Sequence, residues 1–191
     1  MNFKNAAQRS AVIITILVLS AIVGYIYQLT GHKMDLEQHP REYTELVNKY
    51  ASEYGVPEYI IYGLILTESE FQSNKLSEEG KIGLMQISPD VYKQMQSLTK
   101  ESTESGILYD PETNIRYGVY RLSYLFTQYS RWKTVLAVYA SDEETVKLWL
   151  ENPAYTDENG NLTAIPDSVV ADKVALIEEE AEMYRKLYYS E

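Results

Sequence analysis

The side chain best suited to chemistry in this sequence is that of Glu68, because it interrupts an apolar pattern. Ile61, Leu64, Ile65 and Glu68 follow the i, i+3, i+4, i+7 spacing of one helix face. A carboxyl group on a buried helix face loses hydration, which raises the pKa of such a group. A carboxylic acid that keeps its proton near neutral pH can act as a general acid. The pattern alone also permits a second interpretation, in which Glu68 lies at the edge of the stripe and reaches water.

The elements that must position Glu68 are predicted to be almost entirely helices. A helix over residues 43–54 ends at Gly55, and Pro57 opens the helix that carries Glu68. The pairs Ser88-Pro89 and Asp110-Pro111 are typical of a cap followed by a first helical turn. The fold class is therefore mainly α, with little strand.

Three further signals complete this helical pattern towards the C-terminus. An apolar stripe begins at Trp132, and Ser141 with Glu144 has the spacing of a capping box that opens another helix. Asn159-Gly160 predicts a small hairpin or loop. Asp167 is placed to cap a last amphipathic helix.

Composition excludes several kinds of chemistry. The 191 residues include no cysteine, which excludes disulfides, thiolate metal ligands and thiol nucleophiles. A net charge of −11 argues against a protein built to bind nucleic acid, which usually shows a basic surface.

The N-terminal region has the pattern of a membrane segment. Residues 11–27 carry no charge and extend about 25 Å as a helix, just enough to cross a bilayer core. Lys4 and Arg9 precede this segment and acids appear only from Asp35, so the positive-inside rule places the N-terminus in the cytoplasm. We therefore expect a cytoplasmic stub and transmembrane signal anchor over residues 1–27, a linker over 28–41 and an extracytoplasmic domain over 42–191. A cleaved signal peptide is the main alternative, although no A-x-A-like site follows.

Four ordered motifs connect Glu68 to a known family. They are T-E-S at 67–69, G-L-M-Q-I-S-P at 83–89, D-P-E-T-N-I-R-Y-G at 110–118 and A-V-Y at 137–139. With the Ile165-Pro166 pair before the last helix, this run resembles the soluble lytic transglycosylase family over roughly residues 42–190. The resemblance implies a goose-type lysozyme-like helical domain. It also implies a polysaccharide lyase that cleaves the β-1,4 bond between N-acetylmuramic acid and N-acetylglucosamine in peptidoglycan and leaves a 1,6-anhydro end.

The resemblance also implies roles for particular residues. Glu68 would be the single catalytic residue, first as acid and then as base towards the C6 hydroxyl of the sugar. The matching positions for substrate binding are Ser69, Gly83, Met85, Gln86 and Tyr139. Tyr139 could hold the Glu68 carboxyl by a hydrogen bond, and Gly83 would let the backbone approach Glu68 or substrate. The resemblance implies no cofactor and no metal, and the partners are glycan strands and the membrane, with an envelope protein partner left open.

The sequence departs from the family pattern near the expected groove. Residues 140–142 read A-S-D where the family usually has N-A-G, and Glu70 stands where a small residue is common. Lys81 replaces a usual Ala, and Arg121 takes a position often held by Tyr. These departures leave the acid intact. They motivate an alternative function, a catalytically impaired member that binds glycan or a partner at the cell envelope.

Overall fold

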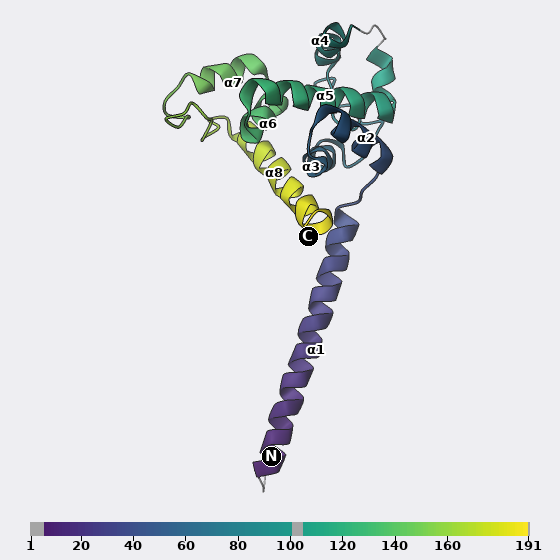
Figure 1. Ribbon diagram of the computed structural model, residues 1–191, viewed down its shortest axis with the longest axis vertical. Coiled ribbons are helices and arrows are strands. Elements are labelled where there is room, and N and C mark those ends of the chain that lie inside the picture. The colour runs from purple at the N-terminus through teal and green to yellow at the C-terminus, as the bar shows by residue number, and fades with distance from the viewer. Residues whose placement is uncertain (1–5, 101–104, 191) are drawn as a thin grey trace. The chain divides into compact units, whose positions relative to one another are not determined.

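The computed structural model describes residues 6–100 and 105–190, and most of this part of the chain is helical (Figure 1). In chain order the elements are α1 (Ala6–Gln38), α2 (Thr44–Tyr54), α3 (Glu58–Ser69), α4 (Pro89–Thr99), the 3₁₀ helix η1 (Ser105–Tyr109), α5 (Pro111–Tyr129), α6 (Trp132–Ala140), α7 (Glu143–Leu150) and α8 (Ser168–Tyr188). Extended pairing among the described residues is confined to isolated antiparallel bridges, such as the bridge between Thr156 and Leu162 around the predicted Asn159-Gly160 loop. The prediction of a mainly α fold is confirmed.

The chain divides into two compact units, Met1–Pro40 and Arg41–Glu191. In the first unit, Ser10–Gln38 is long and apolar enough to cross a membrane by length and composition, with a mean hydropathy of 2.3 over its most apolar window. The helix continues through residues 28–38, which we expected to form a linker. A helix can persist there because the first proline of the chain is Pro40.

The helix boundaries in the second unit follow the predicted capping residues. The side chains of Ser88, Asp110 and Asp167 each accept a hydrogen bond from a backbone N–H in the first turn of α4, α5 and α8. Gly55 ends α2 in the left-handed conformation, as the sequence predicts. The starts of α4, α5 and α8 are therefore set by the hydrogen bonds of their N-cap side chains.

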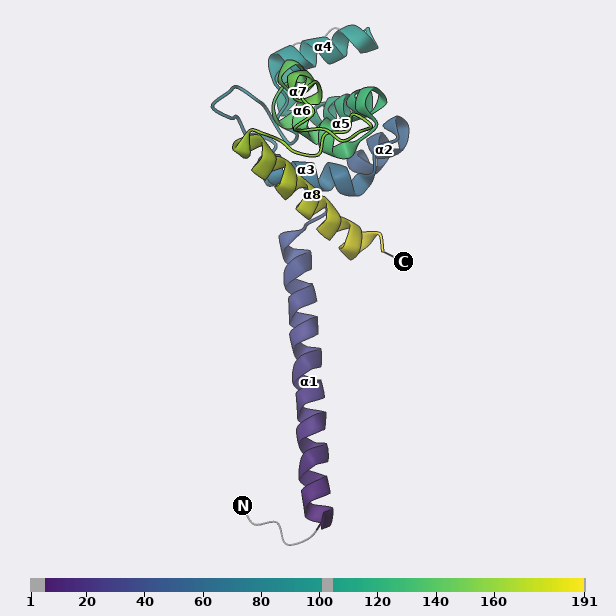
Figure 2. The ribbon, with the colours of Figure 1, turned by 90° about the vertical axis from the view of Figure 1, so that its left-hand side faces the viewer.

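Helices α3 and α8 form the contact that positions the acid, and they lie side by side in both views (Figures 1 and 2). The close approach depends on Gly63, because a Cβ there would lie 2.6 Å from the backbone nitrogen of Ala181. On α3, Ile61 and Leu64 are fully buried, and α8 contributes Val174 to the same core. The apolar faces of two helices far apart in sequence thus bring the last turn of α3 against the first half of α8.

Candidate active site

Glu68 lies in the last turn of α3, and its side chain is only 4 % exposed. The helix ends directly after it because Glu70 and Phe71 both adopt positive φ angles, of 52° and 60°. The backbone N–H of Glu70 donates to the Leu66 carbonyl and closes the final turn. The prediction that Glu68 is buried is confirmed, and the alternative in which it reaches water is wrong. Glu70 itself is exposed beyond the helix end.

The carboxyl group of Glu68 has a charged partner that the sequence did not reveal. Lys173, on α8, places its Nζ 2.8 Å from each carboxylate oxygen and donates to Oε2. The Lys173 side chain is 30 % exposed, so water reaches only one member of the pair. The lone buried acid predicted at position 68 is therefore one half of an ion pair in the structure.

The G-L-M-Q loop is held beneath the site by the fully buried Asn114 of α5. Its Oδ1 accepts from the Met85 backbone N–H at 2.7 Å, and its Nδ2 donates to the carbonyls of Ile82 and Leu108, both at 2.8 Å. Gly83 has a φ of +78°, and a Cβ there would clash with Nδ2 of Asn114. Gly83 therefore allows a close approach to Asn114, and its expected approach to Glu68 or substrate stays a prediction.

Most of the predicted substrate-binding residues lie below the surface. Ser69 and Met85 are fully buried, and the Ser69 hydroxyl donates to the Ile65 carbonyl of its own helix. The Gln86 side chain donates to the carbonyl of Gly83 at 2.7 Å. The structure therefore brings Ser69, Gly83, Met85 and Gln86 together below the site. The substrate-binding role assigned to them by the resemblance stays a prediction.

Tyr139, on α6, also has a different partner from the one expected. Its hydroxyl donates to the Met85 carbonyl at 2.8 Å, and the guanidinium of Arg121 lies over its ring, 4.7 Å from the ring centre. Because a hydroxyl has one proton to donate, the expectation that Tyr139 donates to the Glu68 carboxyl is wrong. Burial raises the pKa of the Tyr139 hydroxyl, so it remains a neutral donor over the physiological range.

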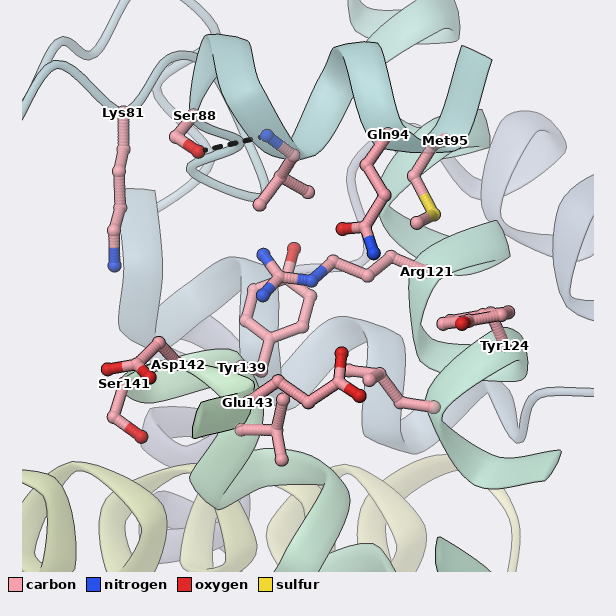
Figure 3. A pocket seen from close by; sticks show the side chains of 13 residues that line it. Lys81, Ser88, Gln94, Met95, Arg121, Tyr124, Tyr139, Ser141, Asp142 and Glu143 are labelled. Carbon is pink, nitrogen blue, oxygen red and sulfur yellow. Dashed lines mark hydrogen bonds between the residues drawn. The ribbon is translucent and has the colours of Figure 1, made fainter. Parts of the chain in front are cut away.

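A cavity of about 260 Å³ lies next to these residues (Figure 3). Tyr139 lines it, and Lys81 and Arg121 are the two cations of its wall. Glu68 is not part of the lining. Burial lowers the pKa of Lys81 and Arg121, and the charge of Glu68 opposes part of that lowering. The cavity is thus electrostatically coupled to the acid.

The departure at residues 140–142 forms one edge of this cavity. Ser141 and Asp142 both line it, and the Ser141 hydroxyl donates to the Ala137 carbonyl. Asp142 caps α7, because its carboxylate accepts from the backbone N–H and the hydroxyl of Thr145. The prediction of a capping box that starts at Ser141 is therefore wrong by one residue. The described residues contain no His, Asp or Glu cluster suited to a metal ion.

The fold and the site define a helical lytic-transglycosylase-type domain with a buried carboxyl group in the last turn of α3. The chain belongs to the transglycosylase SLT domain family, whose model matches residues 45–161. The membrane-bound lytic murein transglycosylase C of Haemophilus influenzae is 38 % identical over 99 residues, covering 49 % of this chain and 27 % of that protein. The protein of the same name from Yersinia pestis is 36 % identical over 107 residues, covering 53 % and 29 %.

Solved structures support the same family. The 70 kDa soluble lytic transglycosylase of Escherichia coli superposes with a TM-score of 0.75 at 27 % identity, covering 82 % of this chain and 26 % of that chain. The lytic transglycosylase Slt of Pseudomonas aeruginosa has the same fold, with a TM-score of 0.71 at 22 % identity over 80 % of this chain and 25 % of that one. The chain thus spans about a quarter of the length of these proteins.

Proposed function

We propose that this protein is a membrane-anchored peptidoglycan lytic transglycosylase in which Glu68 is the catalytic residue. The observation that carries the proposal is the nearly complete burial of a single carboxyl group in the last turn of α3, in the fold of this family. The relatives are named membrane-bound lytic murein transglycosylases, and the apolar helix α1 suits a membrane anchor. We further propose a transmembrane anchor within residues 1–27, a linker over 28–41 and an extracytoplasmic domain over 42–191.

One carboxyl group is sufficient for the proposed reaction. The acid form of Glu68 gives its proton to the glycosidic oxygen between N-acetylmuramic acid and N-acetylglucosamine, and the bond from C1 to that oxygen breaks. The C6 hydroxyl oxygen of the muramic acid then bonds to C1, and its proton passes to the Glu68 carboxylate. Ordinary glycosidases need a second carboxylate, which either attacks the sugar as the nucleophile or activates a water molecule. Here the nucleophile belongs to the substrate, so correct positioning supplies much of the rate.

The test is product analysis of peptidoglycan treated with the full-length protein in detergent. Wild-type protein should release muropeptides with 1,6-anhydro ends. These products are about 18 mass units lighter than hydrolysed ones, because no water is added. Glu68→Gln should release none, whereas the matched variant Glu70→Gln should keep full activity because Glu70 is exposed beyond α3. Products with water-added ends only would refute the transglycosylase chemistry and favour a hydrolase.

A second candidate function is a glycan-binding module without turnover. The ion pair between Glu68 and Lys173 favours it, because a carboxylate held by an ammonium is not a ready proton donor. This candidate predicts that wild-type protein sediments with peptidoglycan yet releases no soluble product between acidic and neutral pH. It also predicts that Lys173→Gln, which removes the cation, leaves the protein equally unable to release product.

The membrane proposal has its own test. In cells that carry a tag at each end of the chain, a protease added from outside should remove the C-terminal tag and leave the N-terminal tag protected. Both tags should remain with membranes after an alkaline carbonate wash. Release of the C-terminal tag from membranes without protease would instead indicate a cleaved signal peptide.

A further inference from the structure

The wall of the cavity beside the active site carries two cations, Lys81 and Arg121, and two acids, Asp142 and Glu143 (Figure 3). The formal charge of this wall is therefore balanced, but neither cation has an ion-pair partner among residues 6–100 and 105–190. Arg121 extends from α5 across the middle of the cavity, and Lys81 enters from the loop that precedes α4. By the resemblance described above, Lys81 replaces a usual Ala and Arg121 takes a position often held by Tyr.

The charged groups of Lys81 and Arg121 have no hydrogen bond or ion pair with residues of 6–100 or 105–190. The only contact of the Arg121 guanidinium recorded in that part of the chain is with the ring of Tyr139. Burial lowers the pKa of both cations, and the nearby charge of Lys173 lowers that of Lys81 further. A partly buried cation without a counter-ion costs free energy, which an incoming anion would offset.

The two acids on the same wall have partners of their own. Glu143 forms an ion pair of 2.8 Å with Lys147, but it also lines the cavity and its charge acts on Arg121. The Asp142 carboxylate is engaged as the cap of α7 through Thr145. Neither acid lies within ion-pair distance of the two cations of the cavity in the described structure.

We propose that this cavity binds a carboxylate group of the glycan substrate, with Lys81 and Arg121 as its counter-ions. The neutral polar groups of Ser88, Gln94 and Ser141 also line the cavity and suit the hydroxyl and amide groups of a sugar. The volume of about 260 Å³ is below the range of roughly 300–1,000 Å³ that is common for small-molecule sites, so it fits a single substituted sugar unit. This proposal rests on the proposed glycan substrate. It adds that the cavity recognises a carboxylate group of that substrate.

The experiment compares the affinity of the full-length wild-type protein, in detergent, for three tetrasaccharides with sulfur in place of the glycosidic oxygens, which prevents cleavage. One carries free lactyl carboxylates, one carries the corresponding carboxamides, and one carries peptide stems that end in carboxylates. Calorimetry at low salt should give roughly tenfold tighter binding for a carboxylate ligand than for the carboxamide, and the ratio should shrink at high salt. The ligand that shows this preference identifies the lactyl group or the stem as the source of the carboxylate.

Variants assign the effect to the two cations. Lys81→Gln and Arg121→Gln should each weaken binding of the preferred ligand about fivefold to tenfold and leave the carboxamide within about twofold, since only charge recognition is lost. Arg121→Lys should retain most of the preference, and Lys186→Gln, whose ammonium pairs with Glu182 on α8 outside the cavity lining, should change neither affinity. Equal affinity for acid and amide ligands overturns the proposal, as does an equal loss for both ligands in Arg121→Gln or the absence of binding by folded protein.

The outcome is separable from that of the proposed function. If carboxylate ligands bind preferentially but peptidoglycan is never cleaved, the anion site stands and the enzymatic proposal fails. If peptidoglycan is cleaved but acid and amide ligands bind equally, the enzymatic proposal stands and the anion site fails.

Discussion

Removal of Lys173 is the perturbation that most directly tests the geometry of the site. Lys173→Met keeps most of the side-chain length and deletes the ammonium that lies 2.8 Å from both oxygens of Glu68. At this distance and an effective dielectric constant of about 20, the attraction amounts to about 6 kcal/mol before desolvation is subtracted. Breaking a fully buried ion pair costs about 3–5 kcal/mol. Because Lys173 is 30 % exposed and water can partly replace it, we expect a loss of about 2 kcal/mol in the free energy of unfolding at pH 7.

A double-mutant cycle separates this charge interaction from changes in packing. Glu68→Gln removes the negative charge with little change in shape, so Lys173→Met should cost much less in that background. We expect a coupling free energy of about 2 kcal/mol between the two positions. Urea unfolding of the full-length protein in detergent, followed by tryptophan fluorescence, is a suitable assay. Both tryptophans of the chain, Trp132 and Trp149, lie in the second unit, so the signal reports only on that unit.

A matched control uses an ion pair of the same length at the surface. Lys147 and Glu143 also lie 2.8 Å apart, but their side chains are 60 % and 36 % exposed. The same cycle there should give about 0.5 kcal/mol or less, because solvent screens the pair. If the coupling of Glu68 with Lys173 is no larger than that of the control, burial does not strengthen the pair and the description of the site given above is refuted.

Three other substitutions test the support of the site, each by the same unfolding assay. Asn114→Ala leaves three buried backbone groups without partners at roughly 1 kcal/mol each, so a loss of about 3 kcal/mol is expected, and a loss below about 1 kcal/mol would contradict its role. Gly63→Ala should cost about 2–3 kcal/mol because backbone atoms of Ala181 cannot easily move; an unchanged midpoint would show that α3 and α8 separate freely. Tyr139→Phe should cost about 1–2 kcal/mol through one unpaired buried carbonyl, with wild-type stability as the contrary result.

The sequence was sufficient to predict the features that depend on neighbouring residues. The starts of α4, α5 and α8 follow from Ser88, Asp110 and Asp167, since an N-cap acts on the backbone two or three residues ahead. The burial of Glu68 is one of the two interpretations that the period of its own helix allows, and the structure decides between them. The start of α7 was misplaced because Ser141 and Asp142 are both good caps, and only the three-dimensional structure shows which of them faces the helix.

The partners of the polar side chains could not be predicted in the same way. Lys173 is 105 residues from Glu68 and lies beside the apolar stripe of α8, where a lysine would ordinarily extend into solvent. Nothing in the local pattern indicates which charged residue on the flank of a helix turns inwards. The same holds for Tyr139, whose apolar surroundings predict burial but leave its hydrogen-bond acceptor open.

The Glu68 pair and the cations of the cavity form one electrostatic system. Lys173 lies 2.8 Å from both oxygens of Glu68, and Lys81 and Arg121 feel the charge of the same carboxyl group from the cavity. In the proposed reaction Glu68 gives one proton to the glycosidic oxygen and receives one from the C6 hydroxyl, so the reaction is neutral in protons. A glycan carboxylate bound beside Lys81 and Arg121 would add an anion to this group of charges. The Lys173→Met variant and the carboxylate ligands therefore test two parts of one site, the ion pair of the acid and the cations of the cavity.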